Sequence, residues 1–373
     1  MFAASLTEAS NTDRMPDFSW DTVPRYMHVR KAAAFTPEEI EYLASFPLVT
    51  FEKTTGMKDA GSTEKGTWLA AKAIKTVNPR CKILYYRNIL VHYAMYGADK
   101  ELADIPGAFL SDKKGNTKLV RQKVPAYDLS NSMVRKWWLR NAELTCKSKY
   151  IDGLFVDGNI KVLEEGYLRR QVGEKKKAEV ETAYHRMMKK LPETVGRDKL
   201  VIANVIRARF DQAGLEYLDY FDGSYIEGFE HAVGGMSREE YMAKGIAAVQ
   251  KAARSGRIIA FTIGMGTYAD TDMDDENHEV DRKAFASVQD RFTYSLALFL
   301  ICAEKQSYFM FSDGYGVDRS RGKLWMKDLP EYSRPLGAPK DPAVRSGYSY
   351  QRKFEHADVS IDIKNETANI NWK

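Results

Sequence analysis

The chain has 373 residues, of which 44% are hydrophobic, so it is long enough to bury a large core. Its 56 basic and 51 acidic residues give a net charge of +5, a mild and scattered excess that does not favour nucleic-acid binding. The longest apolar run, residues 294–303, is too short to span a bilayer, so we expect no membrane partner. Three widely spaced cysteines without a CxxC pair predict buried small side chains, and we expect no metal and no cofactor.

Short apolar runs rich in β-branched and aromatic residues recur along the chain and predict eight strands. They are 25–29, 48–52, 82–88, 153–158, 200–206, 223–229, 258–264 and 307–313.

Helical patterns separate these runs, for example 36–45 with a Thr cap and a Glu three residues later, 132–148, 174–195, 237–256 and 281–304. Alternating apolar strands and helices indicate a parallel sheet covered by helices. Eight units over some 300 residues favour an α/β fold of the (β/α)8 TIM barrel type, and an open doubly wound sheet is the alternative.

The sequence changes character after about residue 334. Val359, Ile361 and Ile363 alternate with polar residues, which is typical of strands with one wet face. We therefore expect a catalytic barrel at 20–334 and a small C-terminal β appendage at 335–373 that packs on it.

Two strands end in the same way. The segments IDGLFVDG (151–158) and FDGSYIEG (221–228) each place an Asp-Gly pair five positions before a second acid-Gly pair. In a barrel the carboxyl ends of the strands carry the chemistry, so Asp157 and Glu227 are expected at the mouth, whereas Asp152 and Asp222 mark the strand starts. Two facing carboxylates can perform glycoside hydrolysis, one as nucleophile or base and the other as general acid/base. The alternative for either acid is a helix cap or an ion pair.

Further polar side chains follow the strand ends and could hydrogen-bond sugar hydroxyls. The candidate substrate-binding residues are Glu52, Arg87, Asn88, His92, Asn159, Asn204, Arg207, His231, Tyr268 and Asp313. Lys53 and Glu230 lie beside members of this set. Asp313, which precedes a glycine, also fits a turn.

The loop 270–281 has aspartates at alternate positions, as a calcium-binding loop has. It has Asp275 where such a loop needs glycine and Asp281 where it needs a bidentate glutamate. An acidic cap for the following helix is the alternative, and the sequence leaves the two open.

The segments YDLSNSMVRKWW, YIDGLFVDGN, SYIEGFEH, YFMFSDGYG and the tail PLGAPKDPAVRSGYSYQRKFEHADVSIDI resemble the glycoside hydrolases of hypothetical glycosyl hydrolase family 15. The chain is similar, more distantly, to glycoside hydrolase family 114 and the α-galactosidase clan. The resemblance covers about residues 20–365.

This resemblance implies that Asp157 is the nucleophile and Glu227 the general acid/base, and the two roles can be exchanged because a sequence shows no pKa environment. It implies a carbohydrate substrate, galactose-like or amino-sugar. The positive charge adds a sulfated polysaccharide as a guess. Ring, linkage, endo or exo cleavage, stereochemistry and oligomeric state stay open. The residues FAAS near the start are typical of the end of a secretory signal, so we expect a periplasmic or secreted protein with its signal trimmed.

Two other functions compete with glycoside hydrolysis. A sugar-binding barrel that lost its chemistry would bind without forming product. A metal-assisted hydrolase would use Glu52, His92, Asp157 and His231 as ligands, and it is the weakest of the three hypotheses.

Overall fold

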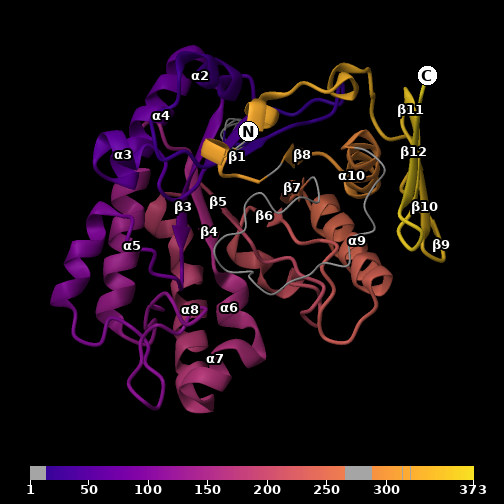
Figure 1. Cartoon of the computed structure of the whole chain (residues 1–373). Helices are drawn as coiled ribbons and strands as arrows, with labels where there is room; N and C mark the ends of the chain where they lie inside the picture. Colours follow the sequence, from indigo (N-terminus) through magenta and orange to yellow (C-terminus); the bar gives the residue numbers. More distant parts are fainter. Residues whose placement is uncertain (1–13, 265–287, 313, 320) are drawn as a thin grey trace, which may run out of the picture. The chain divides into compact units, whose positions relative to one another are not determined.

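The computed structural model describes residues 14–264, 288–312, 314–319 and 321–373. Eight strands form one sheet in which β1 to β8 follow one another in chain order (Figure 1). The pairs β2–β3, β3–β4, β4–β5, β6–β7 and β7–β8 are parallel. Arg25, just before β1, pairs with Phe309 of β8, so the sheet returns toward itself. The fold is the predicted (β/α)8 TIM barrel, and the open doubly wound alternative is wrong.

Each predicted strand run contains a strand; 82–88 and 258–264 have the predicted bounds, whereas 200–206 and 223–229 each lose their last three residues. The strands of the barrel are β1 Met27–Val29, β2 Leu48–Phe51, β3 Lys82–Asn88, β4 Gly153–Asp157, β5 Leu200–Ala203, β6 Gly223–Ile226, β7 Ile258–Gly264 and β8 Ser307–Ser312.

Helices separate most of the strands, as alternation predicted. They are α2 Pro37–Ala44, α3 Met57–Ala60, α4 Thr63–Val77, α5 Ser132–Cys146, α6 Asn159–Leu163, α7 Glu165–Val172, α8 Glu174–Val195, α9 Arg238–Arg254 and α10 Val288–Cys302. Thr36 and Glu39 form the expected capping box of α2, and Ser237 with Glu240 does the same for α9. Short 3-10 turns lie at Gly97–Asp104, Leu215–Tyr220, Val317–Arg319, Arg321–Met326 and Pro330–Ser333. Among the described residues no helix is long and apolar enough to cross a membrane.

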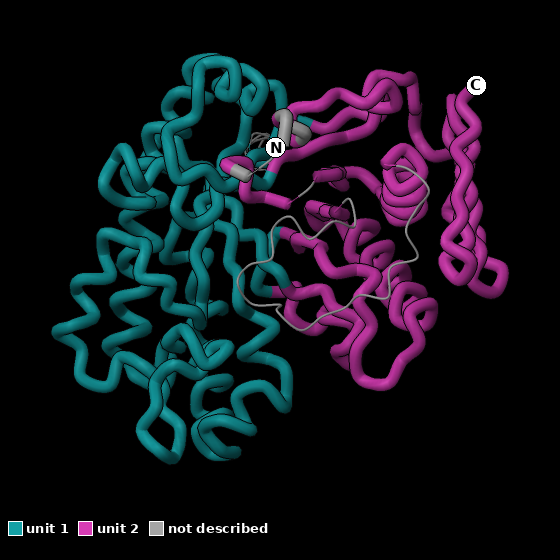
Figure 2. The backbone as a smooth tube through the Cα atoms, in the orientation of Figure 1, with its two compact units in different colours: residues 1–17, 28–204, 220–222 teal, residues 18–27, 205–219, 223–373 magenta. Residues whose placement is uncertain are grey.

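The chain divides into two compact units (Figure 2). The first comprises residues 1–17, 28–204 and 220–222, and the second comprises 18–27, 205–219 and 223–373. The first therefore holds β2 to β5, and the second holds β6 to β8. The boundary expected between 334 and 335 stays a prediction.

The two Asp-Gly pairs at the strand starts are built alike. Asp152 exchanges hydrogen bonds with Ile83, receiving its backbone N–H at 2.8 Å and donating to its carbonyl at 2.8 Å. Asp222 does the same with Val201, at 2.8 and 2.7 Å. A Cβ on the following Gly153 would lie 2.1 Å from a carbonyl oxygen of the next strand, so only glycine fits there.

The predicted C-terminal β structure is a separate antiparallel sheet, ordered β12-β11-β10-β9. Its strands are β9 Val344–Ser346, β10 Ser349–Lys353, β11 Ala357–Asp362 and β12 Thr367–Trp372. Val359 and Ile361 of β11 are buried, while the residues between them are partly exposed, which confirms the alternation. The sheet contacts α10 (Figure 1). Arg352 reaches from β10 to the end of that helix, donating to Leu300 O at 3.1 Å and pairing with Glu304 at 2.9 Å.

Candidate active site

Asp157 lies where β4 ends, as the apolar run before it predicts. Leu154, Phe155 and Val156 are buried, and the Asp157 side chain is the first of the strand to be partly exposed. Gly158 follows in the left-handed conformation, with φ +83°. A Cβ at this position would lie 2.3 Å from Asn88 Oδ1, so the turn needs a residue without a side chain.

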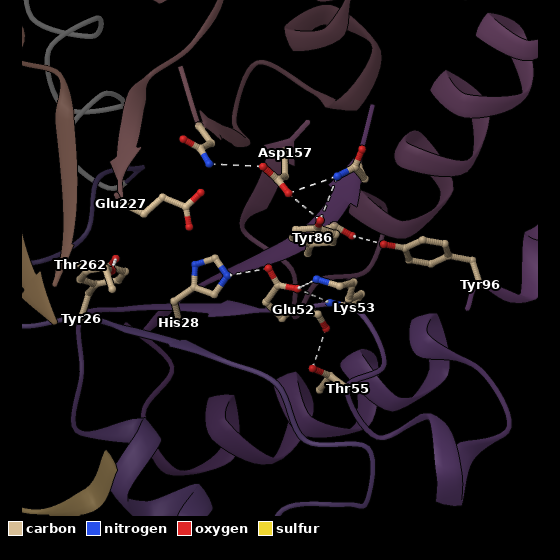
Figure 3. A network of polar contacts seen from close by, with 12 residues as sticks. Tyr26, His28, Glu52, Lys53, Thr55, Tyr86, Tyr96, Asp157, Glu227 and Thr262 are labelled. Atoms are coloured by element: carbon tan, nitrogen blue, oxygen red, sulfur yellow. Dashed lines mark hydrogen bonds and ion pairs between the residues drawn. The ribbon is translucent and has the colours of Figure 1, made fainter. Parts of the chain in front are cut away.

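Side chains from neighbouring strands donate hydrogen bonds to the Asp157 carboxylate (Figure 3). Tyr86 Oη donates to Oδ2 at 2.7 Å, and Asn88 Nδ2 donates to the same oxygen at 3.1 Å. Asn204 Nδ2, just beyond β5, lies 3.4 Å from Oδ1. Burial, with the Asp157 charge as a smaller cause, raises the pKa of Tyr86 well above its usual value. The phenol therefore keeps its proton and remains a donor at neutral pH.

Two asparagines are themselves fixed by the protein. Asn88 Oδ1 accepts from the backbone of Leu90 and Val91, at 3.0 and 2.7 Å, which aims its amide at Asp157. Asn159 is fully buried. Its Nδ2 donates to Val156 O at 2.7 Å, and its Oδ1 accepts from Tyr184 Oη at 2.8 Å. Asn88 thus belongs to the Asp157 cluster, whereas the bonds of Asn159 brace the strand end.

Glu52, which follows β2, lies in a buried charged cluster (Figure 3). Its Oε1 is 3.1 Å from His28 Nε2, and its Oε2 is 3.0 Å from Lys53 Nζ. Burial would raise the pKa of Glu52, but Lys53 and His28 outweigh it and lower that pKa to about 2. The Lys53 ammonium also lies 5.1 Å from the ring centre of Tyr86. The cluster therefore touches the tyrosine that holds Asp157.

Arg87 points away from this cluster, because successive side chains of a strand alternate between its faces. Its guanidinium lies 4.5 Å from the ring centre of Tyr96 and 5.2 and 5.4 Å from those of Trp137 and Trp138. Within the part of the chain that the structure describes, its Nε and Nη2 have no hydrogen-bond partner. His92 also lies among aromatic rings, with Nδ1 3.1 Å from Tyr127 Oη.

In the second unit, Glu227 follows β6 directly. Arg207 Nη2 donates to Glu227 Oε1 at 3.0 Å, and the side chains are 8% and 40% exposed. The arginine is thus buried, and the carboxyl reaches the surface. In the same unit Tyr26 hydrogen-bonds Thr262, and burial raises its pKa, with Glu227 as a smaller cause.

The other candidate residues closely follow Glu227 in the sequence or lie outside the described residues. Glu230 lies in an ion cluster of its own, and His231 donates its backbone N–H to Gly228 O at 3.1 Å. Tyr268, Asp313 and the acidic loop 270–281 lie outside the described residues. Among the described residues, no three His, Cys, Asp or Glu side chains group as a metal site would.

Sequence reasoning missed Tyr86 and His28. The signal for Tyr86 was available, because a residue two positions before Asn88 on a strand shares its face. His28 carried no comparable signal, since its role depends on Glu52 from the next strand.

Comparison with known proteins gives a family. The family model described as hypothetical glycosyl hydrolase family 15 matches residues 75–358. No curated protein sequence matches the chain.

Several solved structures share the fold at low identity. The Anoxybacillus α-amylase is 9% identical with a TM-score of 0.51, over 92% of this chain and 87% of that one. The maltogenic α-amylase AmyB of Thermotoga neapolitana is 12% identical with a TM-score of 0.51, over 92% and 86%. The family 36 α-galactosidase AgaB of Geobacillus stearothermophilus is 11% identical with a TM-score of 0.51, over 94% of this chain but 48% of the enzyme.

Proposed function

The chain belongs to hypothetical glycosyl hydrolase family 15, and from this we propose that it cleaves a polysaccharide or oligosaccharide with Asp157 as nucleophile or base and Glu227 as general acid/base. The observation that carries the proposal is the Asp157 carboxylate, held at the end of β4 by donors from Tyr86, Asn88 and Asn204. A catalytic nucleophile must be held in position, and these donors orient the Asp157 carboxylate.

The hydrogen bonds single out one oxygen of Asp157. Oδ2 accepts from both Tyr86 and Asn88, while among the described residues Oδ1 has only the longer contact with Asn204. We assign Oδ1 as the oxygen that reacts. In a retaining reaction it forms a bond to the anomeric carbon as the glycosidic C–O bond breaks, and in an inverting reaction it takes a proton from water.

Glu227 is assigned to the proton transfer. Its carboxyl is partly exposed, and the buried Arg207 orients it through Oε1. In the first step its proton passes to the leaving oxygen, and in a retaining reaction it then takes a proton from the attacking water. Both residues must reach the same glycosidic bond, so loss of either should stop turnover.

The substrate is proposed at the level of class. We propose a carbohydrate polymer or oligomer of galactose-like, amino-sugar or sulfated units, met by a periplasmic or secreted enzyme. The α-galactosidase and the α-amylases that share the fold act on sugars according to their names, which supports a sugar substrate without choosing one.

The test is product release from neutral, amino-sugar and sulfated polysaccharides and from methylumbelliferyl α- and β-glycosides of galactose, glucose and their N-acetylamino forms. Wild type, Asp157→Asn and Glu227→Gln are compared on each. We expect hydrolysis of at least one substrate by wild type and a loss of at least a thousandfold in each variant. Unchanged turnover in Asp157→Asn would remove the nucleophile assignment, and binding without product from any substrate would favour the non-catalytic barrel.

A further inference from the structure

The loop that carries Glu227 has little conformational restraint of its own. It links β6 to α9 over residues 227–236, and Gly228, Gly234 and Gly235 take φ values of +54°, +75° and +80°. Glycine loses more conformational freedom on folding than any other residue, so three glycines make the ordering of this loop costly. Apart from the contact of Arg207 with its carboxylate, Glu227 can be held in place by the side chains that follow it in the loop.

Phe229 supplies the first anchor. It is 7% exposed, and its ring centre lies 5.2 Å from that of Phe261 on β7. A Cβ on Gly245 of α9 would come within 3.0 Å of the Phe229 ring. The ring therefore packs against α9 where Gly245 has no side chain.

Glu230 supplies the second anchor, three residues after Glu227. Arg291 of α10 grips both of its oxygens, with Nη1 donating to Oε1 at 3.1 Å and Nη2 donating to Oε2. Arg238 of α9 donates to Oε1 at 2.8 Å. Burial would raise the pKa of Glu230, but the two arginines outweigh it and lower that pKa. The carboxylate is thus ionised and clamped, and a forked arginine pair also fixes direction.

The two arginines extend the clamp to other elements of the second unit. Arg291 Nε donates to Gly264 O at the end of β7, at 3.1 Å. Arg238 donates to Ile363 O at 3.0 Å and pairs with Glu366 at 2.7 Å, both at the turn between β11 and β12. One ion cluster therefore joins the Glu227 loop, the end of β7, two helices and the C-terminal sheet.

We propose that Glu230 is a positioning residue for Glu227, and that the C-terminal sheet takes part in catalysis by completing this clamp through Glu366. The inference rests on the proposed role of Glu227 as general acid/base. It gives a role to Glu230, which in the sequence only lies beside the candidate substrate-binding residues. It also gives the appendage a function that packing alone does not require.

The first test separates positioning from sugar binding. Glu230→Gln keeps the shape and removes the charge, and we expect kcat to fall at least tenfold while KM changes less than threefold. The loss should be largest for a methylumbelliferyl glycoside and smaller for the dinitrophenyl glycoside of the same sugar, whose leaving group needs little help from a proton. Arg291→Lys should retain more activity than Arg291→Met, and Glu366→Gln should show a smaller loss of the same kind.

Asp358→Asn is the matched control, because it breaks an exposed ion pair with Lys373 on the same sheet and should change neither constant. Hydrogen exchange of the 227–236 amides gives a readout independent of activity. We expect faster exchange there in Glu230→Gln, with the β4 amides unchanged. Unchanged loop exchange, or an equal loss on both leaving groups, overturns the positioning role. If Glu227→Gln keeps full activity, the proposed function of Glu227 fails. Faster exchange of the 227–236 amides in Glu230→Gln would then still show that Glu230 holds the loop.

Discussion

Tyr86 and Asp157 face each other across two adjacent strands, and the tyrosine hydroxyl donates a 2.7 Å hydrogen bond to the carboxylate. The bond is partly buried and donated to the proposed nucleophile, so its loss should lower the catalytic rate more than the folding stability.

Tyr86→Phe should lower kcat/KM about 10- to 100-fold, because a hydrogen bond to a charged group contributes about 1.5–3 kcal/mol. Steady-state kinetics with the substrate found in the panel measures this. Tyr350→Phe is the control, since Tyr350 is also buried but its hydroxyl has no partner among the described residues. Equal effects of the two changes would mean that the bond to Asp157 contributes nothing specific.

Gly158→Ala should reduce both stability and activity. The new Cβ would be strained at φ +83° and would push Asn88, which bonds Asp157. Gly61 has nearly the same backbone angles, φ +81° and ψ −8° against +83° and 1°, and no described atom lies within 4 Å of a Cβ built there, so Gly61→Ala isolates the backbone strain of about 1–2 kcal/mol. We expect both variants to melt earlier and only Gly158→Ala to lose kcat. If kcat fell equally in both variants, backbone strain alone, without displacement of Asn88, would explain the loss of activity.

Glu52 should make stability fall in acid. Its folded pKa of about 2 lies below the ordinary 4.5, so its stabilisation is complete above pH 4.5 and is lost as the pH falls toward 2. We therefore expect the unfolding free energy, measured in urea, to fall between pH 7 and pH 3 in wild type. This fall should be about 2 kcal/mol smaller in Glu52→Gln.

The double variant Glu52→Gln with Lys53→Met is the control for that measurement. Lys53 is 2% exposed, so Glu52→Gln alone removes the carboxylate that lies 3.0 Å from a buried cation. At pH 7 the double variant should therefore be more stable than Glu52→Gln alone. A double variant less stable than the single one would show that the pair is not coupled as its geometry indicates.

Arg87 should prove structural. Its guanidinium lies among three aromatic rings away from Asp157, so Arg87→Met should lower the unfolding free energy by about 2 kcal/mol and leave KM unchanged. Denaturant unfolding and KM measure the two effects separately. A raised KM in a variant that remains folded would restore Arg87 as a substrate contact.

The barrel could be predicted from the sequence because its strands are short runs rich in apolar residues and helices such as α2, α5 and α9 begin at polar capping residues. It also located Asp157 and Glu227 at strand ends, where neighbouring strands supply partners. It could not separate Arg87 from Asn88 without applying the alternation of strand faces. Nor could it find the clamp on Glu230, because Arg291 lies some sixty residues further on and the contact depends on how α10 packs.

The repeated Asp-Gly pairs allow one more prediction, because the acids at the strand starts should stabilise the fold and those at the strand ends should act in the reaction. Asp152 and Asp222 each receive a strand N–H at 2.8 Å, and each is paired with a cation, Lys75 or Arg14. Asp152→Ala and Asp222→Ala should therefore lower the unfolding free energy by about 1–3 kcal/mol each and leave kcat within twofold.

Asp157→Asn and Glu227→Gln should behave in the opposite way, with melting temperatures near wild type and turnover abolished. The contrast matters because all four acids precede a glycine in the same spacing, so the motif alone cannot account for it. What differs is the end of the strand at which each carboxylate lies: at the start it accepts a backbone N–H of the neighbouring strand, and at the tip it accepts side-chain donors. If Asp152→Ala abolished turnover without loss of stability, that division of roles would be wrong.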